Sequence, residues 1–371
     1  MALKRIDMRI GIIGGGAAGS YLAIRIKEKH PSFIVTIIEK NNALLKKVSV
    51  TGNGRCNYAN LGSTINKYHN DTFANNVLKH LPAEKLSLIF EEMGIHPYRI
   101  DNLLFPVSLS AQTVLLMLNK RIEALGIKVV LNQEFIDYQK EENVFKVKTS
   151  EDVYAFDYLI IATGGAAYPQ LGTDGKVYDV LRKHGYNITP LSPSLSPIKV
   201  KENTKKVSGQ RVKARVSLYQ NDILYYQEDG EVLFKDDGIS GIVILNISQK
   251  INELKDKNNV TIYLDLANDK SSIKKENYIQ YVPPKVAQYL LDNNLDIHAL
   301  KYTFKSFYDF NIAEVTSGGV NINEVNEHLE SKKDSHLFFA GEVLDVDGMC
   351  GGFNLMFAFA CGELISDCIE D

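Results

Sequence analysis

A glycine-rich turn near the start of the chain places the tightest constraint on its fold. Residues 14–19 match the pattern G-x-G-x-x-G. An apolar run over 8–13 leads into this turn, and apolar residues then recur at helical spacing over 17–29. A second apolar run, 34–38, ends at Glu39, 20 residues after the last glycine of the turn. This is the order and length of a βαβ unit, in which a crossover helix joins two buried parallel strands.

The turn is predicted to bind a dinucleotide. Gly14 allows a tight turn, Gly16 lets a pyrophosphate approach the backbone closely, and Gly19 lets the helix pack on the strand. A helix that begins near Ala17 points unpaired N–H groups and its positive dipole end at the phosphates. Glu39 suits a ribose diol and would repel a 2′-phosphate. The alternative, a glycine turn that only packs a helix, is disfavoured by the complete βαβ context.

Two later strand ends favour FAD over NAD as the dinucleotide. Residues 161–165 read I-A-T-G-G after an apolar run, and an A-T-G turn of this kind is common in two-part FAD folds. Residues 339–342 read F-A-G-E and end another apolar run just before the terminal helix. FAD is long and needs contacts from several strand ends, whereas NAD enzymes rarely bring their C-terminus back to the nucleotide. We therefore expect non-covalently bound FAD.

The pattern along the chain predicts one domain made from both of its ends. The expected helices and strands of this domain are helices over 83–93, 110–125 and 353–369, and strands over 127–131, 144–149, 158–162 and 336–341. Near residue 190 prolines cluster and short alternating segments begin. We expect an α/β, Rossmann-like FAD-binding domain of glutathione-reductase type from 1–189 and 313–371. The inserted substrate domain, 190–312, is expected to be β-rich over 190–268 and helical over 269–312.

The composition excludes several classes of function. A net charge of −3 and the mixed charges of the lysine-containing stretch 199–213 give no concentrated basic surface, so no nucleic-acid partner is expected. No apolar run approaches the roughly 20 residues that span a bilayer. The basic residues at the start of the chain precede an apolar run, as in a signal peptide. This run leads into the glycine turn without a small-residue cleavage site, so no signal peptide is expected. The four cysteines form no CxxC pair, which favours reduced thiols and a cytoplasmic location.

The remaining residues suggest little chemistry apart from that of the flavin. The eight histidines show no metal-ligand spacing, and no metal is expected. Cys56 and Cys350 raise the alternative of a redox-active pair, but Cys56 has no partner nearby in sequence. Cys361 and Cys368, on the last helix, are expected to be core residues. Four tyrosines of the insertion are candidate walls of a substrate pocket, although aromatic residues in strands are more often core: Tyr219, Tyr225, Tyr226 and Tyr263.

Several longer motifs give a family resemblance. They are KVSVTGNGRCN (47–57), LLFPVSLSAQTV (103–114), ATGGAAYPQLGTDGK (162–176), FKDDGISG (234–241), EVTSGGVNINEV (314–325) and FAGEVLDVDGMCGGFNL (339–355). Together they resemble the BaiN/RdsA (aminoacetone-oxidase-like) family of bacterial NAD(P)/FAD-dependent oxidoreductases. The motifs cover nearly the whole chain in the family's order. The resemblance implies that the insertion holds a β-barrel-like region and a small helical region.

The resemblance also implies a function and a set of contacts. It implies an FAD-dependent oxidoreductase that moves electrons between a small organic substrate and FAD, with NADH or NADPH as a transient donor. The alternatives are an oxygen-dependent amine oxidase, a non-enzymatic flavin redox sensor and an RNA-modifying protein. Catalysis is expected from the flavin itself, with Arg55 and Asn57 as candidate catalytic groups. The residues expected to contact FAD are Gly14, Gly16, Ala17, Ala18, Gly19, Glu39, Lys40, Lys47, Asn53, Gly54, Arg55, Cys56, Asn57, Phe135, Ala162, Thr163, Gly164, Gly341, Glu342, Asp347, Gly352, Phe353, Asn354 and Leu355.

Overall fold

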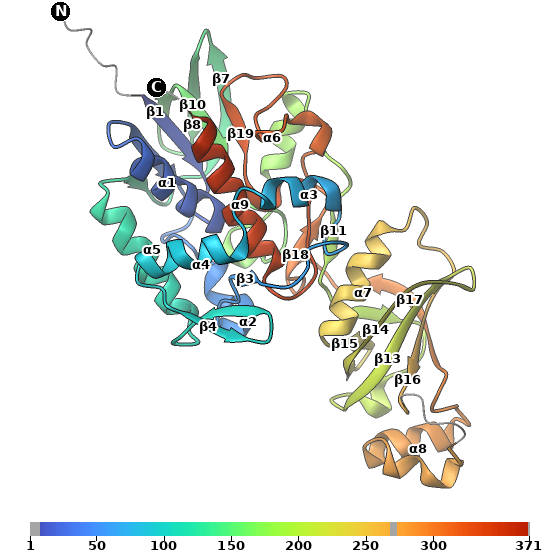
Figure 1. Cartoon of the computed structure of the whole chain (residues 1–371). Coiled ribbons are helices and arrows are strands. Elements are labelled where there is room, and N and C mark those ends of the chain that lie inside the picture. The colour runs from blue at the N-terminus through green and yellow to red at the C-terminus, as the bar shows by residue number, and fades with distance from the viewer. Residues whose placement is uncertain (1–7, 268–272, 370–371) are drawn as a thin grey trace, which may run out of the picture. The chain divides into compact units, whose positions relative to one another are not determined.

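The computed structural model describes residues 8–267 and 273–369. Two compact units make up this structure (Figure 1). The first combines the two ends of the chain, up to Leu191 and from Gly318, and the second comprises Ser192–Ser317. Strand β11 (Ser192–Ser194) pairs antiparallel with β18 (Val315–Ser317), so the chain enters and leaves the second unit through adjacent strands.

A five-stranded sheet forms the centre of the first unit. Its order is β19-β10-β1-β2-β6, and all neighbouring strands are parallel. Its strands are β1 (Arg9–Ile13), β2 (Ile34–Ile38), β6 (Lys128–Val130), β10 (Tyr158–Ile161) and β19 (Leu337–Phe339). All except β6 are almost entirely buried, which explains why their sequences are continuous runs rich in isoleucine, leucine, valine and phenylalanine.

Two helices of this unit pack against each other. Helix α1 (Ala17–Lys29) joins β1 to β2, and α9 (Phe353–Cys368) is the last helix of the chain (Figure 1). Their backbones approach closely at Gly362, where a Cβ atom would lie 3.2 Å from the Leu22 nitrogen. Most of α9 is buried on every side, so its sequence is apolar nearly throughout instead of amphipathic. The C-terminal helix is therefore a central element of the first unit.

Smaller elements surround this core. The remaining helices are α2 (Thr51–Gly54), α3 (Asp71–Leu78), α4 (Ala83–Glu92), α5 (Ala111–Ala124) and α6 (Val177–Lys183). One small sheet has the order β3-β5-β4, with β3 (Ala59–Asn60), β4 (Pro97–Ile100) and β5 (Leu103–Pro106). The other is β7-β8-β9, with β7 (Phe135–Glu141), β8 (Val144–Thr149) and β9 (Val153–Phe156). In the described part of the chain, no helix has the length and apolar character needed to cross a membrane.

The second unit is built on a closed barrel. Its strand order is β12-β15-β14-β13-β16-β17. The strands are β12 (Ile198–Val200), β13 (Arg211–Gln220), β14 (Ile223–Lys235), β15 (Gly238–Ser240), β16 (Val260–Asp265) and β17 (Leu300–Phe307). Helix α7 (Ile242–Glu253) packs against β14, and residues of α7 and α8 (Pro284–Asp292) share one buried apolar cluster with the barrel. The expected α/β fold class with an inserted barrel-like region is thus confirmed.

Two parts of the insertion differ from what the sequence predicted. The segment 190–268, expected to be β-rich, also contains α7, whose apolar residues recur at the spacing of one buried helical face. The segment 269–312, expected to be helical, contains β17 as well as α8. In β17 buried apolar and exposed polar residues alternate at its start, as a two-faced barrel strand requires.

One buried carboxylate ties three helices of the first unit together. The Glu363 side chain on α9 is 2 % exposed and accepts hydrogen bonds from Tyr21 Oη (3.1 Å) and Arg25 Nε (2.8 Å) on α1. The ammonium groups of Lys29 on α1 and Lys85 on α4 lie 3.3 Å from its other oxygen. Burial opposes ionisation of Glu363, but Arg25 and the two lysines outweigh it and lower its pKa to about 2. The ionised carboxylate therefore stabilises the packing of α9 against α1 and α4.

Replacing Glu363 with Gln should lower the free energy of unfolding by about 2–3 kcal/mol at pH 7, because the surrounding cations lose a shared buried partner. The folded-state pKa lies below the unfolded value, so this stabilisation is present above about pH 4.5 and is lost as the pH falls toward 2. Urea unfolding at pH 7 and pH 3 should show the difference between wild type and variant shrinking by about half. An equal difference at both pH values would contradict this account. Glu141→Gln, which removes an exposed ion pair with Lys146, is the control and should change stability by less than about 1 kcal/mol.

Candidate cofactor-binding site

The glycine turn after β1 has the close contacts that its pattern predicts. Gly14 has a φ of +102°, and a Cβ there would lie 2.5 Å from the carbonyl oxygen of Ala162, just after β10. A Cβ at Gly19 would lie 2.0 Å from the Gly14 carbonyl oxygen, so only glycine lets α1 approach the turn this closely. A Cβ at Gly16, by contrast, would meet no atom within 4 Å. The fold itself requires two of these glycines, whereas the third leaves open space.

Backbone donors from the first turn of α1 border this open space. Gly16 is the N-cap residue, and Ala17 and Ala18 begin the helix, so their N–H groups have no partner within it. The first turn has no acidic side chain that would oppose an anion. The space beside Gly16 therefore fits the pyrophosphate of FAD, which needs close backbone approach and unpaired N–H groups.

Glu39 is held beside this turn by its own hydrogen bonds. Its Oε2 accepts from the Gly15 N–H (2.8 Å), and its Oε1 accepts from both the backbone N–H and the side-chain amide of Asn41 (2.8 Å each). The carboxylate is buried at the end of β2. Its orientation is therefore set before any ligand binds, and its oxygens keep lone pairs for a ribose hydroxyl.

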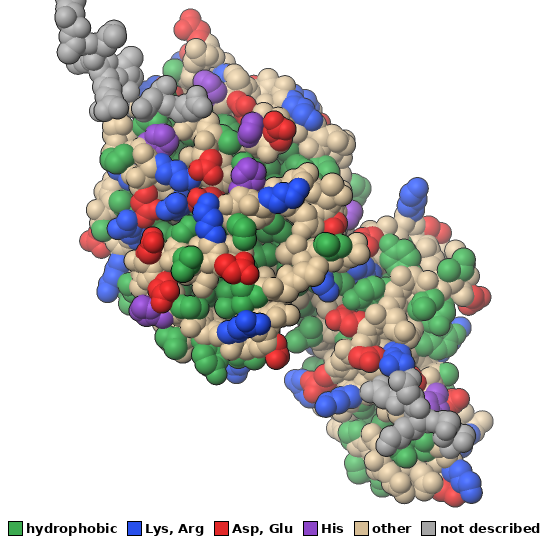
Figure 2. All heavy atoms as spheres, viewed as in Figure 1, with side chains coloured by type: hydrophobic (Ala, Val, Ile, Leu, Met, Phe, Trp, Pro, Cys, Tyr) green, Lys and Arg blue, Asp and Glu red, His purple; other side chains and the backbone are tan. Residues whose placement is uncertain are grey.

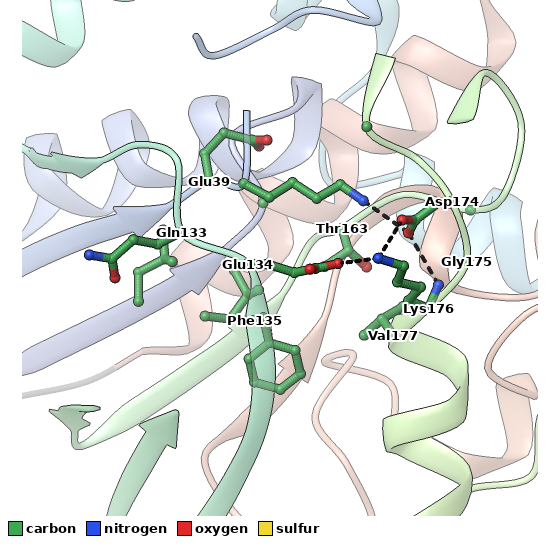
Figure 3. Close-up of a pocket in the computed structure, with 15 residues that line it drawn as sticks. Glu39, Gln133, Glu134, Phe135, Thr163, Asp174, Gly175, Lys176 and Val177 are labelled. Atoms are coloured by element: carbon green, nitrogen blue, oxygen red, sulfur yellow. Dashed lines mark hydrogen bonds and ion pairs between the residues drawn. The ribbon is translucent and has the colours of Figure 1, made fainter. Parts of the chain in front are cut away.

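An open cleft lies at the carboxyl ends of β1, β2 and β10 (Figure 3). Parallel α/β sheets bind nucleotides at this edge. The residues of the cleft that the sequence predicted as cofactor contacts are Gly14, Glu39, Lys40, Phe135 and Thr163. Because the cleft begins at the glycine turn and Glu39, it is the candidate site for the adenosine end of FAD.

The cleft also has walls that the predicted contacts omit. Gln133 and Glu134 precede β7, and Asp174 and Lys176 lie in the loop that leads into α6. The T-D-G-K part of this loop lies within 162–176, one of the segments that carries the family resemblance, so a signal for it was present. Gln133 and Glu134 had no such signal, since only their position next to Phe135 brings them to the cleft.

Residues 51–57 form a tight loop with a strained backbone. Positive φ values occur at Gly52 (56°), Asn53 (56°), Gly54 (77°) and Cys56 (57°). For the two residues with side chains this conformation costs about 1 kcal/mol or more each. Asn53 and Arg55 are exposed, whereas Cys56 is fully buried. Strain of this kind persists where the surrounding structure maintains it, commonly at functional sites.

Asn57 joins this loop to the start of α9. The neighbouring donors and acceptors fix the orientation of the Asn57 carboxamide. The side-chain nitrogen donates to the carbonyl oxygens of Ala59 (3.0 Å) and Leu104 (3.1 Å), and the side-chain oxygen accepts from the Gly352 N–H (3.1 Å). Gly352 is the N-cap residue of α9 and has a φ of +90°. Of the two candidate catalytic side chains, Asn57 is thus engaged with backbone groups, whereas Arg55 is exposed.

Hydrogen bonds hold the first turn of α9 (353–355) and the segment that precedes it in place. The Asn354 oxygen accepts from the Gly348 N–H and its nitrogen donates to the Gly348 carbonyl, both at 2.8 Å. Asp347 is fully buried, and its carbonyl accepts from the His69 N–H at 2.8 Å. The backbone N–H groups of Phe353, Asn354 and Leu355 are in the first turn of α9 and have no acceptor within the helix, so they are candidate donors to a ligand.

Contacts between predicted residues join segments that are far apart in the sequence. A Cβ at Gly164, whose φ is +74°, would lie 4.0 Å from Glu342 Oε2. The same Glu342 oxygen pairs with Lys47 Nζ at 2.7 Å. A Cβ at Gly341 would lie 3.1 Å from the Ala18 Cβ on α1. These contacts bring Lys47 and Gly164 to Glu342, and Gly341 to the first turn of α1.

The cysteines do not support a redox pair. Cys56 and Cys350 are not joined by a disulfide. Burial raises the pKa of the Cys56 thiol to about 12, against a small opposing effect of its hydrogen bond with Thr51. At neutral pH Cys56 is therefore a protonated thiol, which is a poor nucleophile.

The sequence profile described as HI0933-like protein Rossmann domain matches residues 8–367. The chain belongs to the HI0933-like family. This confirms the expected family and enzyme class, so the chain is an FAD-dependent oxidoreductase. The match spans both compact units of the chain, so it includes the glycine turn after β1 as well as the start of α9.

Named relatives match over almost the whole chain. The 3-dehydro-bile acid delta(4,6)-reductase of Clostridium scindens is 30 % identical, with 96 % of this chain and 97 % of the relative covered. A ribosomal RNA dihydrouridine synthase of Haemophilus influenzae is 27 % identical (96 % and 98 % covered), and that of Escherichia coli is 25 % identical (94 % of each).

Solved structures share the fold at low identity. Quinol fumarate reductase of E. coli has a TM-score of 0.54 at 13 % identity, with 98 % of this chain and 70 % of that chain covered. The 3-ketosteroid-delta4-(5alpha)-dehydrogenase of Rhodococcus jostii has a TM-score of 0.50 at 11 % identity, with 100 % and 99 % covered. Both support the architecture of this HI0933-like protein and no more than that.

Gly16→Ala should weaken FAD binding by at least about tenfold and leave the FAD-free protein folded, because the added methyl group fills the space for pyrophosphate but touches no protein atom. Gly19→Ala is the matched comparison, since its methyl group overlaps the Gly14 carbonyl oxygen and should destabilise the protein itself. Titration with FAD, followed by flavin fluorescence, measures binding, and thermal unfolding of the FAD-free proteins measures stability. An unchanged FAD affinity in Gly16→Ala would contradict this role of the turn.

Proposed function

We propose that this enzyme reduces a carbon–carbon double bond conjugated with a carbonyl group. The observation that carries the proposal is the chemistry shared by the two kinds of named relative. A 3-dehydro bile acid with Δ4 and Δ6 double bonds is a conjugated dienone, and dihydrouridine is uridine saturated at the bond conjugated with its C4 carbonyl. The two substrates differ greatly in size and charge. Both reactions, however, add two electrons and two protons across the same kind of activated bond.

The proposed donor of the electrons is NADH or NADPH. In the balanced reaction, NAD(P)H and one proton convert the unsaturated carbonyl compound to its dihydro product and NAD(P)⁺. FAD, when bound, carries the electron pair between donor and substrate. The sequence contains one G-x-G-x-x-G turn that lies within a complete βαβ unit, so we propose that the nicotinamide visits the flavin transiently and has no Rossmann domain of its own.

This chain's residues contribute binding and electrostatics to the proposed reaction. We assign the pyrophosphate to the first turn of α1 beside Gly16, the ribose to Glu39, and the flavin end to the loop 51–57 and the first turn of α9. The unpaired N–H groups and positive dipole end of α9 would stabilise negative charge on a reduced ring. Arg55, exposed on the loop, is available to hold an anionic substrate group.

A small organic enone is the substrate class that we favour. The bile acid reductase is the relative with 30 % identity, compared with 27 % and 25 % for the RNA-modifying relatives. Residues 192–317 contain 17 Lys and Arg and 16 Asp and Glu, which gives the insertion no basic excess for a polyanion. Figure 2 shows the two signs of charge interspersed on the face in view, without an extended basic area. Uridine in RNA is the second candidate, supported by the names of two relatives.

An anaerobic half-reaction assay tests the proposal. The holoenzyme is reduced with NADH or NADPH until the flavin absorbance bleaches, and is then mixed with a 3-oxo-4-ene steroid, with the saturated 3-oxo steroid as control. We expect the enone to restore the oxidised flavin spectrum and to lose its double bond, and the saturated ketone to do neither, because only the conjugated bond accepts electrons. An rRNA fragment containing uridine is tested in parallel over a range of salt concentrations.

Each other outcome points to a different function. Reoxidation by the RNA alone, with a steep loss of activity as salt increases, would replace the small enone with RNA. Bleaching by an amine with release of hydrogen peroxide would identify an oxidase and contradict the proposal. Reduction of the flavin without turnover of any enone or RNA would leave a redox sensor as the better account.

A further inference from the structure

Four charged side chains meet at the cleft where the adenosine end of FAD is expected. Lys40 Nζ lies 2.9 Å from Asp174 Oδ1, and Lys176 Nζ lies 2.8 Å from Glu134 Oε1 and 3.6 Å from Asp174 Oδ2. All four residues line the cleft, and two of the ion pairs, Lys40–Asp174 and Lys176–Glu134, run between its walls (Figure 3). We call Lys40, Glu134, Asp174 and Lys176 the clasp.

The clasp connects three segments that are far apart in the sequence. Lys40 follows Glu39 at the end of β2, Glu134 precedes β7, and the other two residues lie in the loop before α6. An opening of the cleft between any two of these walls must therefore separate at least one ion pair. In the structure all of these ion pairs are formed, so the clasp spans the cleft.

The loop that carries Asp174 and Lys176 contains two glycines in the left-handed region and is held to the opposite wall by polar contacts. Gly172 and Gly175 within it have φ values of +107° and +73°, which favour glycine. One further hydrogen bond, from the side-chain amide of Asn41 to the Leu171 carbonyl (3.1 Å), holds the loop to the end of β2. The loop is thus attached to the opposite wall by a few polar contacts that can break without disturbing an apolar core.

The strength of the ion pairs suits a barrier that opens repeatedly. The side chains of Lys40 and Asp174 are 27 % and 28 % exposed, and that of Lys176 is 67 % exposed, so each pair is partly screened by solvent. Burial opposes ionisation of Asp174, but the hydrogen bond and charge of Lys40 outweigh it, and its pKa lies below the usual value. The carboxylate therefore stays ionised at neutral pH, and the clasp responds to salt rather than to pH there.

We propose that the clasp is a gate that controls the exchange of FAD. It must open to admit the adenosine end of the cofactor, and once it has reclosed it slows release. The gate concerns cofactor retention and does not depend on which substrate the enzyme reduces. Its test therefore reads FAD release directly and can fail while the proposed reductase activity stands, or the reverse.

Wild-type holoenzyme provides the first test. FAD release is followed by the rise of free-flavin fluorescence after a large dilution, at low ionic strength and in 0.5 M salt. Release should be about three- to tenfold faster in high salt, because screening weakens the partly exposed pairs that close the gate. A release rate that is independent of ionic strength would overturn the proposal.

Asp174→Asn provides the second test. The substitution removes the charge shared by two of the ion pairs, while an amide oxygen can still accept the 3.3 Å hydrogen bond from the Lys176 N–H. FAD release at low salt should be about three- to tenfold faster than in wild type, and its salt dependence should flatten. Asp179→Asn, which removes an ion pair with Arg182 that is not part of the cleft, is the matched control and should release FAD like wild type.

A double variant shows whether the residues act together. If Lys40 acts through Asp174, Lys40→Met should accelerate release by itself, and combining it with Asp174→Asn should add little. Unchanged release in both single variants, or equal acceleration in the Asp179→Asn control, would overturn the gate. Fully multiplicative effects of Lys40→Met and Asp174→Asn would do so as well, because they would mean that the two residues contact FAD independently.

Discussion

The contact between the glycine turn and its neighbours is the constraint on which the rest of the structure depends. At Gly14 and Gly19 the ends of β1 and β10 and the start of α1 approach more closely than any side chain allows. This approach places the first turn of α1 beside the carboxyl ends of three parallel strands. The same contact sets the distance between the end of β2, where Glu39 lies, and the turn after β10. The close packing that brings the strands of the sheet together therefore also forms the cleft.

The other half of the candidate site is built by the C-terminal part of the chain, which returns to the first unit after the insertion. Helix α9 is buried against α1, and Glu363 gives this mostly apolar contact a specific polar anchor. At the N-terminal end of α9, the side-chain oxygen of Asn57 accepts a hydrogen bond from the N–H of the cap residue Gly352. One side chain therefore positions both the strained loop and the start of the helix. A strained loop needs such rigid supports, because otherwise the backbone would relax and release the strain.

The parts of this protein that the sequence predicted are those with a local signature. The glycine turn, the buried strand runs and the apolar C-terminal helix all follow from spacing along the chain. Helix α7 and strand β17 were missed because the insertion mixes helical and alternating patterns over short distances. The clasp was missed for a different reason, since ion pairs between Lys40, Asp174 and Glu134 depend on which loops meet in space. Asn57 illustrates a third limit: a motif marks a residue, but does not say whether its side chain faces a ligand or the backbone.

The antiparallel pairing of β11 with β18 has a consequence for how such proteins diverge. Ser192 lies opposite Ser317, so the chain leaves and re-enters the first unit at adjacent points. An insertion attached in this way can lengthen, shorten or be replaced without changing the distance between the two points at which it joins the first unit. Relatives of nearly the same length are named for reactions on a bile acid and on ribosomal RNA. Residues 192–317 are thus attached to the first unit through one pair of adjacent strands, so a change of sequence or length within them need not alter the parallel sheet or the glycine turn of the first unit.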